Sequence, residues 1–434
     1  MKKSNFLFLC LLPLTAFTQE LLTLQQAVEI VLKNNYAIQI AKNETQVAQN
    51  DASYGNAGML PSVTVGASAN WASNDTRQQF STGTDVDKKD AGSFSTSAGV
   101  ALNWTIFDGL KMFATYDKLQ TLYDMSVTGL KIEVENTVAD LTTVYYSLVR
   151  QKQLIKAIEN SIVLYEERIK IAETKWKIGS ASKLDYLQAQ VDMNEQKSNL
   201  LRQKNTLKEL KANLNALLAR PADTEFEVEN EISISYNPTY DEIKSTVLKG
   251  NNQLLLQQQN ILAFEYTLKE AKSQRMPRLS LNAAYNYSRT ENQAGFILFN
   301  QNLGFNAGLT ASWTIFNGGN TSRQIRDTEV QLMSSQLYYS DTKAVIESEV
   351  LNAYNLFKNA MELLSLEEEN FKLAKENVDI ALERFKLGNV TSLELKEAQK
   401  SFEDAQARLV TARYETKVAE TELMRLSGML VKST

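Results

Sequence analysis

The chain has 434 residues with 46 basic and 51 acidic side chains, no histidine and one cysteine, and its formal net charge at pH 7 is −5. This length allows two or three ordinary domains or one extended, repeated body. The acidic balance argues against nucleic acid as a partner. Without histidine the chain has no imidazole catalysis, and its only cysteine, Cys10, lies in an N-terminal leader, so disulfide and thiolate chemistry are excluded from the mature chain.

Residues 1–18 are expected to be a secretory signal peptide. Lys2 and Lys3 precede an apolar run from Phe6 to Leu14, and cleavage is expected just before Gln19. The run is far shorter than the roughly 20 residues of a spanning helix, which argues against a membrane anchor. A secreted chain can still enter a membrane as β-strands.

The first half of the mature chain, residues 19–218, begins with helical periodicity over residues 24–56. Two segments, residues 62–71 and 97–104, then alternate apolar side chains with small or polar ones. This period of two predicts strands of roughly the 9 to 11 residues that cross a bilayer. The polar residues 74–93 between them are expected to form an external loop.

The second strand ends in Trp104-Thr-Ile-Phe-Asp-Gly109, where a strand is expected to become a helix. Trp104 suits a membrane interface, Asp108 can cap the new helix, and Gly109 relaxes the backbone at the joint. Helical periodicity then continues to just before Gly179, over about 65 to 70 residues or roughly 100 Å. Apolar residues repeat every seven positions near the end of this helix and predict a two-helix coiled-coil seam. The seam residues are Leu141, Leu148, Ile155, Ile162, Ile169 and Trp176, joined by Ile158, Tyr165 and Ala172.

Gly179 is expected to end the long helix in a left-handed turn that reverses the chain. Residues 182–218 then return as a helix of about half the length, so each half forms a helical hairpin projecting from two strands. Residues 219–239 break the helical pattern and are expected to be an irregular equatorial linker, with one short strand around residues 232–235.

Residues 240–427 repeat this organisation, and residues 428–434 form a tail. Trp313, Asn317 and Gly318 stand 209 residues after Trp104, Asp108 and Gly109, which predicts an internal two-fold repeat. The expected elements are a helix over 240–275, strands over 279–288 and 303–315 with a loop over 289–301, a long helix to just before Gly388, and a helix over 391–427. The second seam consists of Val350, Phe357, Leu364, Phe371, Val378 and Phe385, joined by Ala360, Ala374 and Ala381.

The alternating strands have two explanations, a soluble sheet packed on a core and a membrane barrel. The secretory leader, the strand length and aromatic strand ends favour the barrel. These aromatic ends are Trp71, Trp104, Phe107, Trp313 and Phe316. Four strands cannot close, and an open edge in lipid costs several kcal/mol per unpaired amide, so copies of the chain must complete the barrel. Two copies would give a filled interior, and a water-filled lumen needs at least three.

With these motifs in order and duplicated, the sequence resembles the TolC-type outer-membrane efflux proteins. The resemblance rests on "GMLPSVTV" and "RMPRLSL" at strand entry, "WTIFDG" and "WTIFNGG" at strand exit, and "KIGSASKLDYLQAQ" and "KLGNVTSLELKEAQ" at the hairpin turns. It implies an α+β homotrimer with a twelve-stranded barrel in outer-membrane lipid and a helical tunnel in the periplasm. It also implies docking of the tunnel tip to a periplasmic adaptor protein and an inner-membrane transporter.

The same resemblance assigns roles to residues near the hairpin turns. The implied adaptor contacts are Lys177, Gly179, Ser180, Lys386, Gly388 and Asn389. Asp185, Glu394 and Glu397 are implied to line a narrow entrance that favours cations. The alternative for these acids is that they complement the dipoles of new helices. Val390 stands where the best-known family member has an arginine, so no gate locked by salt bridges at that position is expected.

The expected function is a passive exit duct of a tripartite efflux pump or type I secretion system. The chain has no phosphate-binding glycine loop, so the transporter is expected to supply the energy. No enzyme activity, cofactor or metal site is expected. One alternative is a secreted coiled-coil scaffold without a pore, and another is a hydrolase that uses carboxylate pairs.

Overall fold

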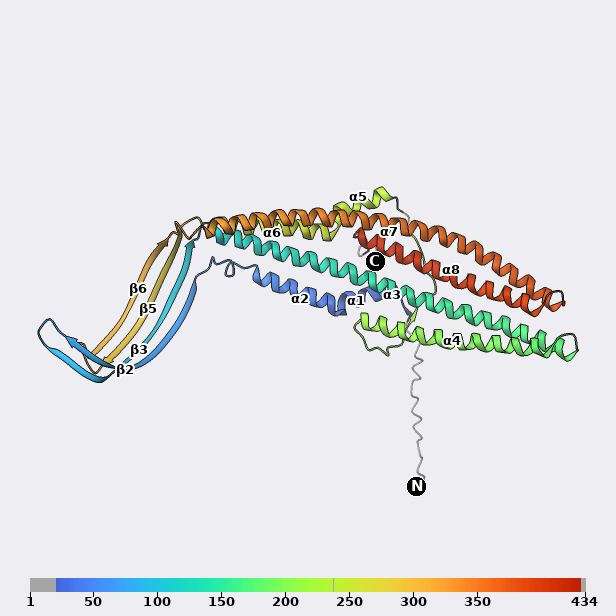
Figure 1. Ribbon diagram of the computed structural model, residues 1–434, viewed down its shortest axis with the longest axis horizontal. Coiled ribbons are helices and arrows are strands. Elements are labelled where there is room, and N and C mark those ends of the chain that lie inside the picture. The colour runs from blue at the N-terminus through green and yellow to red at the C-terminus, as the bar shows by residue number, and fades with distance from the viewer. Residues whose placement is uncertain (1–20, 237, 431–434) are drawn as a thin grey trace, which may run out of the picture. The chain divides into compact units, whose positions relative to one another are not determined.

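The computed structural model describes residues 21–236 and 238–430, which form two compact units (Figure 1). The strand unit comprises Ala41–Lys131 and Asn252–Val345. The helical unit comprises Ile132–Asn251, the chain from Ile346 onward and the residues before Ala41. Each unit therefore takes segments from both halves of the sequence. The expected signal peptide and residues 431–434 of the expected tail lie outside the described residues.

The strand unit is built on one antiparallel sheet in the order β2, β3, β5 and β6 (Figure 1). The strands are β2 (Ser62–Gln79), β3 (Asp85–Phe107), β5 (Arg278–Asn292) and β6 (Phe299–Ser312). Apolar residues pair with apolar residues across the sheet, and small or polar residues pair with small or polar ones, which confirms the predicted alternation of an apolar and a polar face. One row consists of Val65, Val100, Tyr285 and Phe305, and the next of Gly66, Gly99, Asn286 and Gly304.

The strands are longer than expected, so the loop predicted over residues 74–93 is largely wrong and the one predicted over residues 289–301 is shortened to residues 293–298. β2 and β3 stay paired through most of residues 74–93, with one bulge between Asn74 and Thr76. β5 and β6 likewise occupy most of residues 289–301. Alternation marks a strand only where its two faces meet different surroundings, so a strand that is polar on both faces looks like a loop in the sequence. β6 ends at Ser312 and not, as predicted, at residue 315.

The helices provide most of the regular structure. In chain order they are α1 (Leu24–Asn34), α2 (Tyr36–Asp51), α3 (Lys111–Lys177), α4 (Lys183–Leu217), α5 (Tyr240–Gly250), α6 (Asn252–Ser273), α7 (Asn320–Lys386) and α8 (Ser392–Leu426). α3 and α7 have 67 residues each, and α4 and α8 have 35 each, which confirms the predicted long and half-length helices. In the described part of the chain, none of the helices combines the length and the apolar character needed to span a membrane.

The prediction of unbroken helices over residues 24–56 and 240–275 is wrong. Asn35 has extended backbone and separates α1 from α2, and Asn251 does the same between α5 and α6. The side-chain oxygen of Asn35 accepts a hydrogen bond from Ala37 N at 2.9 Å, so it caps the new helix. Its side-chain nitrogen donates to a carbonyl at the end of α4, 3.0 Å away, and this contact outweighs the helical continuation.

Most residues of the predicted coiled-coil seams are buried in the helical unit, and the rest are half-buried. Leu148 of α3 and Phe357 of α7 have no exposed surface, and each such side chain contributes about 2 kcal/mol through burial. Phe371 of α7 stacks on Phe402 of α8, with ring centroids 5.7 Å apart. The seams therefore hold each long helix against its half-length partner.

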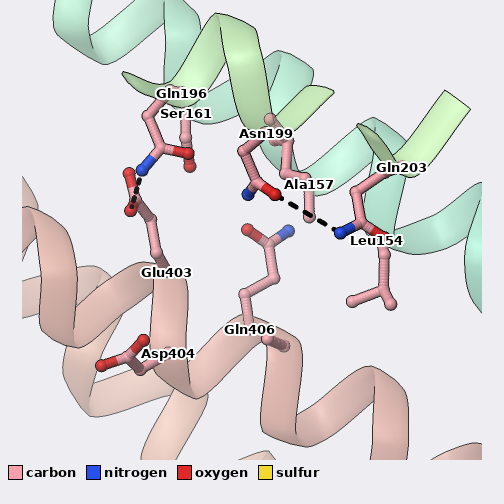
Figure 2. Close-up of a pocket in the computed structure, with 11 residues that line it drawn as sticks. Leu154, Ala157, Ser161, Gln196, Asn199, Gln203, Glu403, Asp404 and Gln406 are labelled. Atoms are coloured by element: carbon pink, nitrogen blue, oxygen red, sulfur yellow. Dashed lines mark hydrogen bonds between the residues drawn. The ribbon is translucent and has the colours of Figure 1, made fainter. Parts of the chain in front are cut away.

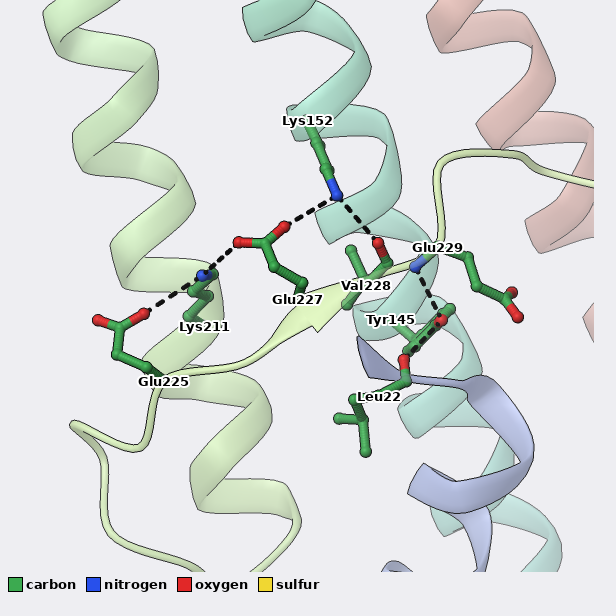
Figure 3. A network of polar contacts seen from close by, with 8 residues as sticks. All are labelled: Leu22, Tyr145, Lys152, Lys211, Glu225, Glu227, Val228 and Glu229. Carbon is green, nitrogen blue, oxygen red and sulfur yellow. Dashed lines mark hydrogen bonds and ion pairs between the residues drawn. The ribbon is translucent and has the colours of Figure 1, made fainter. Parts of the chain in front are cut away.

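A two-stranded parallel sheet lies beside α3 in the helical unit, where β1 (Leu21–Leu22) pairs with β4 (Glu227–Val228). Figure 3 shows Tyr145 of α3 between the two segments. Its hydroxyl donates to Leu22 O at 2.9 Å and accepts from Glu229 N at 3.3 Å. One buried tyrosine thus holds the start of the described chain to the linker.

Charged contacts attach the same linker to α3 and α4. Lys152 and Lys211 lie 2.8 and 3.2 Å from the two carboxylate oxygens of Glu227 (Figure 3). Burial alone would raise the pKa of Glu227, but the hydrogen bonds from these two lysines hold it below its usual value. The carboxylate therefore stays ionised and bridges both helices.

The linker over residues 219–239 is otherwise irregular in its described part, and the strand predicted at residues 232–235 is wrong. The backbone amides of Ser235 and Tyr236 donate to Glu420 Oε1 of α8 at 2.9 and 2.7 Å. A buried carboxylate satisfies these amides, so no neighbouring strand is needed.

Candidate functional site at the hairpin tips

The two hairpins of the helical unit reverse direction in the same way. Gly179 follows α3 with φ +77°, and Gly388 follows α7 with φ +81°. The next residues, Ser180 and Asn389, each donate their amide to a carbonyl five residues earlier, at 2.8 and 2.9 Å. Glycine adopts this left-handed backbone without the steric cost of a side chain, so both turns depend on it.

The three acids expected at the entrance have different surroundings. Glu394 forms a capping box with Thr391, because its Oε2 accepts from Thr391 N at 2.6 Å while Glu394 N donates to Thr391 Oγ1 at 3.2 Å. The bond from the Thr391 amide holds the pKa of Glu394 below its usual value. Asp185 lies in the first turn of α4, and Glu397 is exposed on α8. Glu394 therefore stabilises a helix start, which was the alternative expectation for these acids.

Glu394 and Glu397 line one cavity of about 480 Å³ between α7 and α8. Ile380, Arg384 and Val390 also line it. Asp185 is absent from this lining, so the structure brings together two of the three expected acids within one chain.

The expected docking residues Lys177 and Lys386 both form salt bridges. Lys177 lies 2.7 Å from Glu173, one turn earlier in α3. Lys386 lies 2.8 Å from Glu167 of α3 and 2.8 Å from Glu383 of α7. Hydrogen bonds to these two carboxylates raise the pKa of Lys386 to about 12. Lys386 thus connects the two hairpins, whereas Lys177 does not.

A buried ionic network that the sequence did not indicate also joins the hairpins. Arg168 of α3 and Asp192 of α4 have side chains that are only 1% and 5% exposed, and their charged atoms lie 3.0 Å apart. The Arg168 guanidinium also donates to Gln399 Oε1 at 3.3 Å and to Ser392 Oγ at 3.1 Å. Lys396 of α8 lies 2.9 Å from the second oxygen of Asp192. Three helices from both hairpins therefore share one set of buried charges.

The Asp192 carboxylate of this network is ionised at neutral pH. Burial would raise the pKa of Asp192, but hydrogen bonds from Lys396 and Gln188 and the charge of Arg168 hold it below its usual value. Because the folded pKa lies below the unfolded one, this stabilisation is present above the unfolded pKa and is lost as the pH falls through the folded pKa. Val390 packs against a buried apolar cluster beside the tips and takes no part in the network.

A second cavity, of about 310 Å³, opens between α4 and α8 over α3 (Figure 2). Amide side chains from α4 face Glu403 and Gln406 of α8 across it, and Gln196 Nε2 donates to Glu403 Oε2 at 3.1 Å. Burial raises the pKa of Glu403 to about 7. This carboxyl therefore changes charge near neutral pH.

The two strand-to-helix joints of the strand unit anchor their tryptophans in the same way. Trp104 Nε1 donates to Met59 O at 2.9 Å, and Trp313 Nε1 donates to Arg275 O at 3.0 Å. Each indole is tied to the chain just before its strand pair, and its ring remains exposed in the single chain, at 40% and 62% respectively.

The residues after each tryptophan also match. The side chains of Asp108 and Asn317 each accept from the amide four residues later, at 3.1 and 3.3 Å. Gly109 and Leu110 have φ of +73° and +69°, and Gly318 and the glycine after it have +69° and +80°. The turn is therefore the same in both halves, although Leu110 adopts it at a cost of about 1 kcal/mol.

Comparison with known proteins extends over both joints and both hairpin turns. The sequence matches the outer membrane efflux protein family over residues 27–220 and 244–429. It is 20% identical to outer membrane efflux protein BepC of Brucella suis biovar 1 (strain 1330), over 77% of this chain and 72% of BepC. It is 18% identical to the proteases secretion protein PrtF of Dickeya chrysanthemi, over 99% of this chain and 93% of PrtF. The fold is similar to that of the outer membrane protein VceC from Vibrio cholerae, with a TM-score of 0.76, 16% identity, and coverage of 93% and 96%.

The family consists of channel proteins that work in efflux pumps with adaptor proteins and inner-membrane transporters, and in type I secretion. The predicted exit duct is thereby confirmed, and the alternative of a scaffold without a pore is not supported. The chain belongs to the outer membrane efflux protein family and is an outer-membrane channel with a helical body in the periplasm.

Proposed function

We propose that three copies of the chain close one membrane barrel and one helical tunnel, through which substrates leave the periplasm. The main support for this proposal is that the sheet has two free edges. In the described part of the chain, β2 and β6 each have a neighbouring strand on one side only. Lipid offers no partners for the unpaired amides of such edges. Pairing β6 of one copy with β2 of the next satisfies them, and three copies leave a water-filled lumen where two would not.

The exposed side chains of the sheet fit this arrangement. Val65 is 80% exposed and Phe305 is 70% exposed in the single chain, and both lie on the apolar face. A monomer in water would bury such a surface. In the trimer this face meets lipid, and the polar face lines the pore.

A row of exposed apolar side chains on α7 supports contact between copies in the helical unit. Its members follow a spacing of seven or three residues, as in a coiled-coil seam, although the seam toward α8 uses other residues. The row consists of Leu356, Leu363, Leu366, Leu373 and Ile380, each at least 40% exposed. We propose that a helix of a second copy packs against this row.

In this assembly the hairpin tips form the periplasmic entrance and the docking site for the adaptor protein. Three copies place rings of Asp185, Glu394 and Glu397 around the entrance, which favours cations there. The network of Arg168, Asp192 and Lys396 ties the hairpins together and keeps the entrance narrow. Because this network is buried within each chain, a closed entrance does not require an arginine at position 390.

We infer that the chain consists of two repeats, residues 19–218 and 240–427, which are joined by the linker over residues 219–239. In support, the order after β1 is the same in both, with two helices, two strands and two further helices in each. The protein acts in this scheme as a conduit without catalytic activity of its own.

The experiment is to measure the mass of the detergent-solubilised particle and its conductance in a planar bilayer. We expect three chains per particle and discrete conductance steps. Leu363→Glu is expected to dissociate the particle, because it places a charge in the contact between copies. Lys372→Glu, at an exposed position on the same helix, is the matched control and is expected to remain trimeric. A monomer that is soluble without detergent and gives no conductance would overturn the proposal.

A further inference from the structure

The paired residues on the polar face of the sheet include few charged side chains, and these are all positive. Most side chains on this face are Ser, Thr, Asn, Ala or Gly, and they bond to one another across strands. Ser68 and Ser97 lie 2.8 Å apart, and Asn282 donates to Thr310 at 3.1 Å. At Gly99 a Cβ would lie 2.3 Å from the Asn286 side chain, so this layer has no space for larger groups there.

Among the register-paired residues of the four described strands, the polar face has two ionisable side chains, and both are cationic. Lys88 pairs with Thr76 near the hairpin loops, where its Nζ donates to Gln293 O at 2.9 Å. Arg278 pairs with Ser312 at the opposite end of the sheet, where the strands approach the helices. The acids of these strands pair on the apolar face or lie at the bulge.

Arg278 is held beside a polar cavity. Its Nη2 donates to Thr105 Oγ1 at 2.8 Å, and it forms no salt bridge with any described residue. The cavity has a volume of about 470 Å³ and is also lined by Lys111 and Asp108. The Asp108 carboxylate accepts from the Met112 amide at the start of α3 and so is already engaged. With Arg278 and Lys111 against Asp108, the cavity lining keeps a net positive charge, and the Arg278 guanidinium has no ionic partner among the described residues.

We propose that Arg278 forms a ring of three guanidinium groups at the helix end of the strand-lined pore, and that this ring binds polyvalent anions. The inference rests on the trimeric barrel proposed above, in which the polar face becomes the lumen. Guanidinium stays protonated at every physiological pH, and rings of arginine are a general means of favouring anions in a pore. The paired polar face has no acidic residue to offset the three charges, and Asp108 beside each of them is matched by Lys111.

The ring gives the channel two zones of opposite preference. The proposed carboxylate rings at the hairpin tips favour cations, whereas Arg278 favours anions where the pore enters the membrane. A substrate with separated anionic and cationic groups is matched by both zones. Small anions are retained briefly at the ring, and salt weakens this retention through screening.

The test uses the full-length protein, reconstituted in a planar bilayer, with inorganic tripolyphosphate as the probe. Tripolyphosphate added on the side of the β2–β3 turn is expected to block the wild-type current, more strongly than from the hairpin-tip side and less strongly as KCl rises. Arg278→Gln is expected to weaken this block by about tenfold, since three nearby charges are lost. Arg278→Lys retains the charge and is expected to retain most of the block.

The matched control is Arg289→Gln, which removes an arginine from the apolar face of the same strand, where Arg289 pairs with Glu291. It is expected to leave the block unchanged. If Arg278→Gln does not assemble into channels, the proposed ring is still tested in two ways. One is the block of wild-type channels and its dependence on the side of addition, and the other is the block of Arg278→Lys channels. Wild-type channels that conduct but show no tripolyphosphate block, or an equal block in Arg278→Gln, would overturn the inference alone. A wild-type protein that forms no channel would overturn the trimeric pore as well.

Discussion

Replacing Arg168 by methionine tests whether the buried network holds the two hairpins together. The Arg168 and Asp192 side chains are 1% and 5% exposed, so water compensates neither charge when its partner is lost. Removing one partner of a buried ion pair costs about 3–5 kcal/mol. Lys396 remains 2.9 Å from Asp192 in this variant, so we expect the lower end of that range, about 3 kcal/mol.

Removing the acid is expected to cost more than removing the arginine. Asp192→Asn leaves the Arg168 guanidinium buried with neutral acceptors on Gln399 and Ser392, and we expect a loss of about 5 kcal/mol. The double variant Arg168→Met/Asp192→Asn has neither buried charge, and the 37% exposed Lys396 can turn toward water. Its stability should therefore exceed that of Asp192→Asn alone.

The assays are thermal unfolding followed by helical circular dichroism and the open probability of single channels. A loss of about 3 kcal/mol in the closed state shifts an open–closed equilibrium by about 150-fold, so Arg168→Met channels should be open far more often. Lys177→Met breaks only an exposed pair with Glu173 and is the control, for which we expect wild-type unfolding and wild-type open probability. If Arg168→Met unfolds and opens like the wild type, or if the losses in the double variant are purely additive, the buried network does not hold the two hairpins together.

Two further substitutions test local features. Gly109→Ala would place a Cβ 2.5 Å from Ser273 O, whereas at Gly318 the nearest atom is 4.0 Å away. We expect losses of about 3 kcal/mol and about 1 kcal/mol respectively, measured by thermal unfolding, and equal losses would contradict the packing at the first joint. For Glu403, burial raises the folded pKa from 4.5 to about 7, so the fold binds more protons than the unfolded chain and stability falls as pH rises between these values. Glu403→Gln should remove this fall, raising stability by at most about 3 kcal/mol near pH 8 and little near pH 5, and an unchanged pH profile would contradict it.

The features that the sequence predicted are those with a strong period. Heptads ending near Gly179 and Gly388 marked both long helices and their seams, and alternation marked the middle of every strand. The outer ends of β2 and β3 were missed because a strand with water on both faces has no alternation to detect. The breaks at Asn35 and Asn251 were missed because they depend on side-chain contacts with helices far along the chain, which local propensity does not contain.

The sequence predicted the turns of the candidate site but not the buried ionic network inside it. Gly179 and Gly388 were identified because a left-handed turn after a helix requires glycine. Arg168 was missed because a charged residue on a polar helix is normally solvated. Its position was the available signal, since it lies one helical turn from Tyr165 and Ala172, two residues of the predicted seam. A charge so close to a seam is buried as soon as a second hairpin packs there.

We propose that copies of this chain close a barrel through the free edges of β2 and β6. Electron microscopy of the detergent-purified particle can show this pairing. We expect three chains around one lumen, with β6 of each chain paired to β2 of the next and Arg278 facing the pore. A particle with one chain, or a trimer in which those two edges remain unpaired, would contradict it.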